Sequence, residues 1–228
     1  IRRPPRSTLF PSTPLFRATA QALASLISEL QQKDRFALDL ETTSLNPKTC
    51  QILGLAVSHT AHSGAFIPLP EDEAANRAVL EELRPLLENQ GIAKVGHNLK
   101  YDVAVLRWHG VDLAGPLHDT MVAAFLATPD LRRSMDYLAQ ALLGYRPVPI
   151  ADLIGERGKE QLPMREVPLE ELTEYAAEDA DIALQLWDRL EPLLEESDQM
   201  RLYLQVEAPL IPVLAAMEHA GIRVDPEI

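Results

Sequence analysis

The sequence predicts an α/β fold in which a mixed β-sheet is flanked by helices. Three short apolar segments, at residues 35–40, 51–58 and 64–68, follow one another closely, with turn residues such as Pro47 between them. A fourth segment, at residues 93–96, comes only after a helical segment that can cross over the sheet. Strands joined directly favour antiparallel pairing and a crossover favours parallel pairing, so we expect a mixed sheet.

Helices are expected in most of the remaining chain. An Ala- and Leu-rich segment predicts a first helix at residues 18–32, and a second is expected at residues 78–87, with Pro85 as a bend. The last predicted helix begins after Pro168 and has two glutamates in its first turn, both typical of a helix start. The helices expected after the fourth strand are at residues 100–109, 119–127, 134–143 (closed by Gly144) and 169–195.

Composition and length are typical of one globular domain with a short extension. Of the 228 residues, 46% are hydrophobic and 24% are charged. No apolar run in the sequence reaches the roughly 18 residues of a membrane span, so no membrane partner is expected. Cys50 is the single cysteine, which excludes an internal disulfide and favours a reducing cytoplasm.

Residues 1–17 differ from everything downstream. They are rich in Pro and Arg, lack an initiating Met, and have neither the apolar core nor the cleavage site of a secretory signal. We interpret them as a disordered, non-native segment and assign the first domain to residues 18–195.

The net charge of −13 argues against a protein that coats duplex DNA, because such binding relies on many Lys and Arg contacts to phosphate. A site for a few unpaired nucleotides is compatible with this charge. The candidates for a small basic rim around such a site are Lys94, Lys100, Arg107, Arg132 and Arg133.

Two acids lie at the end of the first predicted strand. Asp39 and Glu41 come directly after the largely apolar residues 35–38, and alternation along a strand sends both side chains to one face. A strand face that packs into a core carries apolar residues, because an unpaired buried carboxylate costs several kcal/mol. The pair therefore predicts a functional face.

A tyrosine and a further acid share one face of the last predicted helix. Tyr175 and Asp179 are four residues apart, which places them about 6 Å apart along the helix axis. A phenol with a pKa near 10 is a poor base at neutral pH. We therefore expect Tyr175 to orient an attacking water by a hydrogen bond.

If the carboxylates of Asp39, Glu41, Asp102 and Asp179 converge, each pair at about 4 Å repels by about 4 kcal/mol at an effective dielectric near 20. Their convergence therefore requires a cation among them or raised pKa values. Hard oxygen ligands suit Mg²⁺ or Mn²⁺ better than zinc. The reaction expected of such a site is phosphodiester hydrolysis with two metal ions.

Each stretch also has a plain structural explanation. Asp39 and Glu41 alone fit a strand end with solvated acids, and Asn98 alone fits a helix cap. Tyr175 and Asp179 alone fit an amphipathic helix with a solvated acidic face. The three stretches together favour the metal site. The histidines do not form a credible zinc site, because no cysteine lies near them.

Taken together, these stretches resemble the proofreading 3′–5′ exonuclease domain of bacterial family A DNA polymerases, the DNA polymerase I type. That domain belongs to the exonucleases named for four acids and a tyrosine. The resemblance implies a ribonuclease H-like fold, with Asp39, Glu41, Asp102 and Asp179 as metal-binding acids and Tyr175 as the tyrosine. The matching motifs are Asn98-Leu99-Lys100-Tyr101-Asp102, His118-Asp119-Thr120-Met121, Met135-Asp136-Tyr137-Leu138-Ala139 and Tyr175-Ala176-Ala177-Glu178-Asp179-Ala180-Asp181.

The resemblance also implies contacts with a DNA 3′ end. It assigns Leu45 as an apolar wedge beside the terminal base, and Arg132 or its neighbour Arg133 as a phosphate contact. The substrate-binding positions it places along the single strand are Asn98, Lys100 and Tyr101, with His97 beside them. A cation and an amide donor suit phosphate oxygens, and a tyrosine ring stacks on any base. The chain departs from the family at His97, where glutamine is common, and at Ile150, where an aromatic is common.

The tail carries a second resemblance. Residues 206–214 and 217–222 are similar to the segment that opens the polymerase domain, so residues 196–228 are interpreted as its truncated start. Pro209 and Pro212 are expected to kink or interrupt the helical pattern there. The partners implied are the single-stranded DNA 3′ end and the rest of a polymerase chain, in a monomer. The location implied is the bacterial cytoplasm, at the nucleoid.

Three functions are compared. The leading one is a 3′–5′ DNA exonuclease within a family A polymerase. The second is an RNA exonuclease of the ribonuclease D type, which shares the acids and the tyrosine but which the polymerase-like tail disfavours. The third is a noncatalytic spacer domain, which requires that the four acids do not converge.

Overall fold

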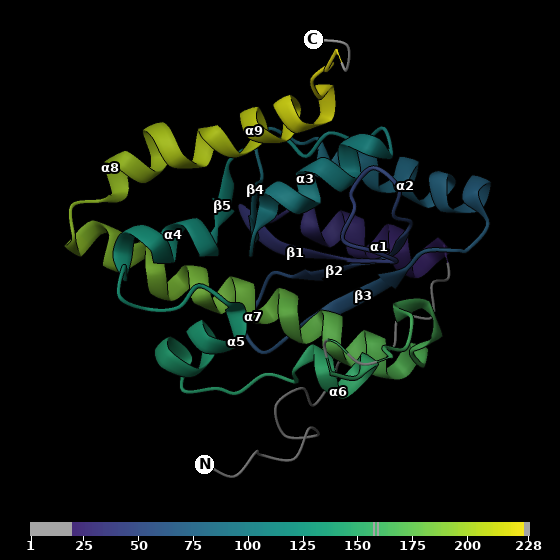
Figure 1. Ribbon diagram of the computed structural model, residues 1–228, viewed down its shortest axis with the longest axis horizontal. Coiled ribbons are helices and arrows are strands. Elements are labelled where there is room, and N and C mark those ends of the chain that lie inside the picture. The colour runs from purple at the N-terminus through teal and green to yellow at the C-terminus, as the bar shows by residue number, and fades with distance from the viewer. Residues whose placement is uncertain (1–19, 157, 159, 226–228) are drawn as a thin grey trace.

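The computed structural model describes residues 20–156, 158 and 160–225, and within them five strands form one mixed sheet in the order β3-β2-β1-β4-β5 (Figure 1). β1 pairs antiparallel with β2 and parallel with β4, β3 pairs antiparallel with β2, and β5 pairs parallel with β4. The predicted mixed sheet is therefore confirmed. The bounds are β1 Arg35–Thr42, β2 Ile52–Ser58, β3 Ala65–Pro68, β4 Ala93–Gly96 and β5 Leu117–Asp119.

Helices cover both faces of the sheet, with α7 across one face and α1 and α2 behind the other (Figure 1). Their bounds are α1 Ala20–Leu30, α2 Glu73–Leu87, α3 Leu99–Trp108, α4 Thr120–Ala127, α5 Met135–Leu138, α6 Ile150–Ile154, α7 Leu169–Glu196, α8 Met200–Leu202 and α9 Ala208–Ala220. Single turns of other helix types span Ala139–Leu143 and Tyr203–Glu207 (π) and Met164–Glu166 (3₁₀).

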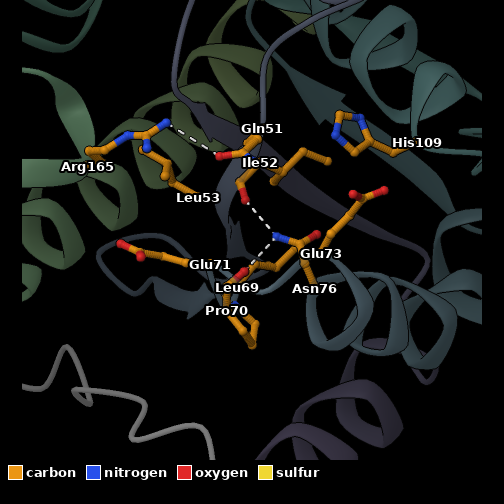
Figure 2. Close-up of a pocket in the computed structure, with 10 residues that line it drawn as sticks. All are labelled: Gln51, Ile52, Leu53, Leu69, Pro70, Glu71, Glu73, Asn76, His109 and Arg165. Atoms are coloured by element: carbon orange, nitrogen blue, oxygen red, sulfur yellow. Dashed lines mark hydrogen bonds between the residues drawn. The ribbon is translucent and has the colours of Figure 1, made fainter.

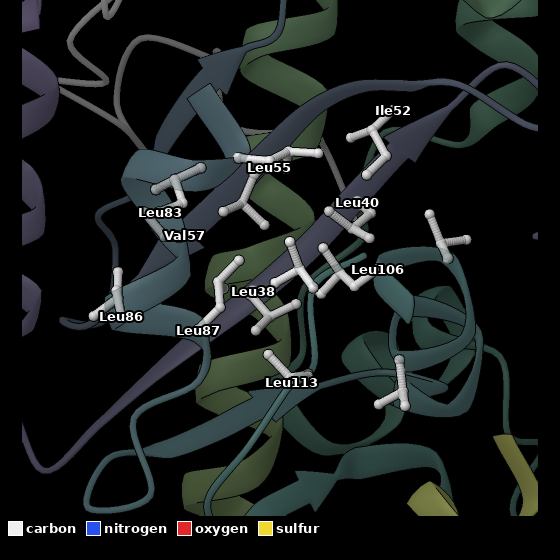
Figure 3. Close-up of a cluster of buried hydrophobic side chains, with 14 of the residues drawn as sticks. Leu38, Leu40, Ile52, Leu55, Val57, Leu83, Leu86, Leu87, Leu106 and Leu113 are labelled. Atoms are coloured by element: carbon white, nitrogen blue, oxygen red, sulfur yellow. The ribbon is translucent and has the colours of Figure 1, made fainter. Parts of the chain in front are cut away.

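The apolar side chains of β1 divide between the two layers. Phe36, Leu38 and Leu40 belong to a core with α1, α2, α3 and two residues of α9. Figure 3 shows Leu38 and Leu40 within this core. Ala37 belongs instead to a core with α4 and α7. Alternation along the strand therefore places the side chains after Ala37 at odd-numbered positions on the α7 side.

Small residues let α7 lie close to the sheet. The face of α7 toward the sheet contains several buried alanines, among them Ala176, Ala177, Ala180 and Ala183. At Gly64, a Cβ atom would lie 2.6 Å from the carbonyl oxygen of Ala177, so only glycine fits this approach. Close packing of α7 brings its polar positions next to β1.

The structure corrects several predicted elements. α2 begins at Glu73, five residues earlier than expected, because Asp72 caps it by accepting a hydrogen bond from the backbone N–H of Ala75 at 2.9 Å. β5, α6 and α8 were not predicted. The helical pattern of the tail is interrupted by the π turn Tyr203–Glu207, and Pro209 lies in the first turn of α9 that follows it. Pro212 lies inside α9.

The tail packs against the domain. Tyr203 and Ala215 are completely buried and Ile211 is 4% exposed. α8 and α9 run along the upper edge in Figure 1, above β4, β5 and α3. The assignment of residues 196–228 to the start of another domain stays a prediction, and residues 1–17 lie outside the described residues. Within the described part of the chain, no helix combines the length and apolarity that a membrane span requires.

Candidate metal centre and active site

β1 and α7 bring three acids together. Because Leu38 and Leu40 fill the core on one side of β1, Asp39 and Glu41 face α7 on the other. Asp179 of α7 meets them there, and one carboxylate oxygen from each of the three lies within 4.8 Å of the others. Glu41 and Asp179 are buried, and Asp39 is partly exposed. The predicted shared face of Asp39 and Glu41 is seen directly.

Ionisation of all three carboxyl groups at once is unfavourable in the absence of a cation. Burial raises the pKa of Asp39 to about 7. Burial, followed by the neighbouring Asp39, raises the pKa of Glu41 well above its usual value. Burial, followed by Asp39 and Glu41, does the same to the pKa of Asp179. A cation placed among them would restore the ionised forms, so the site fits an oxygen-ligated metal.

Asp102 lies beside this cluster and is turned toward the β1 backbone. Its carboxylate is buried, and Oδ1 accepts a hydrogen bond from the N–H of Leu40 at 3.3 Å. Burial, followed by the charge of Asp39, raises its pKa well above the usual value. Of the four predicted acids, three therefore converge and the fourth contacts the strand between Asp39 and Glu41.

Tyr175 stands one helical turn before Asp179, as the spacing predicted. Its hydroxyl and the Asp179 carboxylate lie close enough to influence each other's pKa. Burial, followed by the charges of Asp179, Glu41 and Asp39, raises the pKa of Tyr175 far above its usual value. The phenol therefore remains protonated across the physiological range, which suits a hydrogen-bond donor and excludes a phenolate base.

The loop between β1 and β2 is tied to α3. Leu45 in this loop is 89% exposed. The hydroxyl of Tyr101 donates a hydrogen bond to the carbonyl oxygen of Ser44 at 2.8 Å and lies 2.7 Å from Oγ1 of Thr42. Tyr101 thus holds the loop that presents Leu45, while its own ring is only partly buried.

The start of α3 differs from a side-chain cap by Asn98. Asn98 has left-handed backbone angles (φ 65°), and in the described chain its side chain makes no capping hydrogen bond to α3. The carboxylate of Asp119 accepts hydrogen bonds from the N–H groups of Asn98 and Leu99 instead. Lys100, in the first turn, forms an ion pair with Glu218 of α9.

His97 is fixed by a neighbouring hydroxyl. Its Nδ1 lies 2.8 Å from Oγ1 of Thr120, and that hydroxyl lies 3.0 Å from the carbonyl oxygen of Gly96, to which it donates. Burial lowers the pKa of His97. Ile150, at the second departure from the family pattern, is 46% exposed at the start of α6.

The two candidate phosphate-contacting arginines lie between α4 and α5. The guanidinium of Arg132 is 5.8 Å from the ring centroid of Tyr137. That of Arg133 is 4.4 Å from the ring centroid of Phe125. Both side chains stack on exposed aromatic rings, and the choice between them as the phosphate contact stays a prediction.

Two members of the expected basic rim have other roles. Lys94 is fully buried, and its Nζ donates hydrogen bonds to the carbonyl oxygens of Asn89 (2.5 Å) and Ala114 (2.6 Å). Burial lowers its pKa to about 8. Arg107 pairs with Asp112 at 3.1 Å. Lys94 therefore does not contribute to a rim, which corrects the expectation for this residue.

Sequence reasoning missed the roles of several buried carboxylates with defined partners, among them Asp119 and Glu178. Asp119 caps helices, although its motif had been noted only as part of a family match. Glu178, next to Asp179, accepts hydrogen bonds from the Tyr145 hydroxyl and from the N–H of Val148 (2.8 Å for the latter). Asp119 stands at the first residue of a predicted helix, where an acid is a typical N-cap, whereas no local pattern identifies the partners of Glu178.

A separate pocket lies at the start of β2 (Figure 2). Asn76 donates hydrogen bonds across it to the carbonyl oxygens of Ile52 (2.9 Å) and Pro70 (3.1 Å), and Arg165 reaches Gln51 at 3.4 Å. None of the predicted site residues lines it. The lining residues are Gln51, Ile52, Leu53, Leu69, Pro70, Glu71, Glu73, Asn76, His109 and Arg165.

Comparison with known proteins agrees with this geometry. DNA polymerase I of Chloroflexus aurantiacus is 38% identical over 214 residues, which cover 91% of this chain and 22% of the relative. The POL domain of Pol1 from M. smegmatis, solved in complex with a DNA primer-template and dNTP, has a TM-score of 0.68 at 27% identity, covering 89% of this chain and 31% of that one. The chain thus spans about a quarter of the length of such relatives.

The fold is also shared with a shorter nuclease. Brucella melitensis NrnC has a TM-score of 0.67 at 24% identity, covering 83% of this chain and 87% of that chain, and it has also been solved with bound Mg²⁺. This likeness confirms the ribonuclease H-like fold. The family model described as 3′–5′ exonuclease, of the family A DNA polymerase type, matches residues 16–195. The chain therefore belongs to the 3′–5′ exonuclease family found in DNA polymerase I.

Proposed function

We propose that this domain hydrolyses phosphodiester bonds at the 3′ end of single-stranded DNA, with Asp39, Glu41, Asp102 and Asp179 as ligands of two Mg²⁺ or Mn²⁺ ions. The observation that carries the proposal is the convergence of three carboxylates within 4.8 Å, with burial that resists their ionisation. Bound divalent ions would supply activation of water and stabilisation of the leaving oxygen. The acidic oxygens would hold them without a sulfur or nitrogen ligand.

The chain's own residues would orient the substrate. The hydroxyl of Tyr175, kept protonated by its surroundings, would position the attacking water through a hydrogen bond. Leu45 would wedge against the terminal base, because it is exposed beside the site on a tethered loop. The ring of Tyr101 would stack on a base, which is compatible with removal of any nucleotide.

Phosphate contacts would come from the start of α3 and from the α4–α5 connection. Asn98 supplies an amide and Lys100 a cation at the N-terminus of α3. Arg132 would add a second cation. These few contacts agree with the net charge of −13, which disfavours broad binding to duplex DNA.

DNA is the proposed substrate because the curated relatives are DNA polymerases I and include a 38% identical protein. The likeness to shorter nucleases shows the fold alone, so an RNA exonuclease remains the second candidate. A noncatalytic spacer requires separated acids, and the convergence of three of them argues against it. The proposed context is a monomeric domain of a longer polymerase in the bacterial cytoplasm, at the nucleoid.

The test is nucleotide release from a 3′-labelled single-stranded DNA oligonucleotide with Mg²⁺, compared with a matched RNA. EDTA and Asp39→Ala should abolish release, while Asp34→Ala, which removes an exposed acid next to β1, should not. Faster cleavage of RNA than of DNA would identify the domain as an RNA exonuclease. If the protein is folded, as shown by a cooperative thermal transition, and cleaves neither DNA nor RNA, the domain is a noncatalytic spacer.

A further inference from the structure

One buried carboxylate caps two helices at once. Oδ1 of Asp119 accepts hydrogen bonds from the N–H groups of Met121 (2.8 Å), Val122 (3.2 Å) and Asn98 (3.2 Å), and Oδ2 accepts one from Leu99 (2.7 Å). The first two donors begin α4 and the last two begin α3. Asp119 itself is 1% exposed. Four N–H donors from two helix N-termini thus converge on this one side chain.

This cap fixes the place where α3 begins. Asn98 has left-handed backbone angles that non-glycine residues seldom adopt, and the carboxylate holds its N–H and the next one. The first turn after it carries Lys100, Tyr101 and Asp102. The direction in which α3 leaves the sheet therefore depends on Asp119.

Asp102 links the first turn of α3 to β1. The β1–β4 ladder ends at the pair Ala37–Val95, so Leu40 lies beyond the end of β4. The N–H of Leu40 donates to Asp102 instead, at 3.3 Å. Leu40 stands between Asp39 and Glu41 in the strand. Asp119 is therefore linked to the acidic cluster by hydrogen bonds at two points, to the start of α3 and from Leu40 to Asp102, with the first turn of α3 between them.

The tail holds the backbone of Asp119. The N–H of Asp119 donates to the hydroxyl of Tyr203 at 2.8 Å, and Tyr203 is completely buried. Its ring lies 5.4 Å from that of Trp187 in α7. Tyr203 lies outside residues 16–195, the range that the family model covers.

We propose that Asp119 is a positioning residue for the metal centre, which sets the start of α3 and through it the place of Asp102, and that Tyr203 of the tail holds Asp119 in position. This inference rests on the proposed role of Asp102 as a metal ligand. Neither Asp119 nor Tyr203 touches the three converging carboxylates, so both act through α3. The tail is then part of what organises the nuclease site.

The test measures binding of Mn²⁺ alone to the full chain by isothermal titration calorimetry, with the half-saturating Mn²⁺ concentration for cleavage as a second readout. Asp119→Asn keeps one acceptor oxygen and turns an amide NH₂ toward a helix N–H. We expect Mn²⁺ binding to weaken about tenfold, the lower end of the range for residues that orient metal ligands. Tyr203→Phe should weaken it about two- to fivefold.

A matched control separates positioning from stability. Asp72→Ala removes the cap of α2, a helix without proposed metal ligands, and should lower the melting temperature without changing Mn²⁺ affinity. Wild-type Mn²⁺ affinity in folded Asp119→Asn would overturn the proposal. If Asp119→Asn does not fold, the test rests on Tyr203→Phe, and wild-type Mn²⁺ affinity in that variant would overturn the proposal. If the wild type neither binds Mn²⁺ nor cleaves DNA, the proposed function is overturned as well. If the wild type binds Mn²⁺ and cleaves DNA, and both variants have the same Mn²⁺ affinity as the wild type, only the positioning role is overturned.

Discussion

Lys100 of α3 and Glu218 of α9 form an ion pair that joins the proposed DNA-binding face to the tail. The two side chains are 37% and 54% exposed, so the pair is worth at most about 1 kcal/mol. A phosphate can therefore replace Glu218 as the partner of Lys100. The position of α9 would then influence how available this cation is to a DNA strand.

Glu218→Gln should strengthen binding of single-stranded DNA by about two- to fivefold, because the ion pair no longer competes with phosphate. Fluorescence anisotropy in EDTA at low salt measures this without cleavage. The magnitude of the log–log salt slope should rise by up to about 0.7, the value for one added contact to a single strand. Glu196→Gln, an exposed acid at the end of α7, is the control for net charge. An equal gain in that variant would show that the ion pair is not responsible.

Asp179→Asn should abolish cleavage and stabilise the metal-free protein. The substitution removes one charge from the cluster and keeps an oxygen that can accept from Tyr175. We expect a gain on the order of 1–3 kcal/mol in EDTA, below the full repulsion because protons already bind there. Urea unfolding in EDTA and in Mg²⁺ tests it. A loss of stability in EDTA, or retained cleavage, would remove Asp179 from the proposed ligand set.

Tyr175→Phe should slow turnover by about tenfold or more while single-stranded DNA binds nearly as before. The ring and its packing remain, and only the hydroxyl that would orient water is lost. Single-turnover cleavage measures the chemical step, and anisotropy in EDTA measures binding. Unchanged turnover would exclude the hydroxyl from the mechanism.

Local sequence patterns predicted the centre of the site. Alternation placed Asp39 and Glu41 together, and four-residue spacing placed Tyr175 above Asp179, because both rules depend only on the element that carries the residues. The mixed sheet followed in the same way from the order of strands and helices.

The features that were missed depend on chain segments far apart in sequence. Lys94 looked like a surface cation because lysine is seldom buried. Its carbonyl partners are Asn89, in the turn before β4, and Ala114, 20 residues away in the loop before β5. Asp119 meets α3 about twenty residues away, and Lys100 meets Glu218 across the whole second half of the chain. β5 has three residues, too few to show a period. No local pattern contains these contacts.

The stability of the metal-free cluster should depend on pH in a defined direction. Burial raises the pKa of Asp39 from 3.8 to about 7 in the folded protein, so between these values the folded state binds a proton that the unfolded state has lost. The destabilisation from Asp39 therefore grows as pH rises from about 4 to 7 and is constant above. Because the lowered pKa values of His97 and His118 act in the opposite direction, the wild type alone does not isolate this effect.

The informative quantity is the difference in unfolding free energy between Asp39→Asn and the wild type in EDTA, since the histidine contributions cancel. Between pH 4 and 7 the variant should become more stable relative to the wild type, by at most about 4 kcal/mol, and above pH 7 the difference should stay constant. Saturating Mg²⁺ should reverse it at pH 7, because a bound cation favours the ionised carboxylates. A pH-independent difference in EDTA would mean that Asp39 is ionised normally in the folded state, and no reversal with Mg²⁺ would mean that the cluster does not bind this ion.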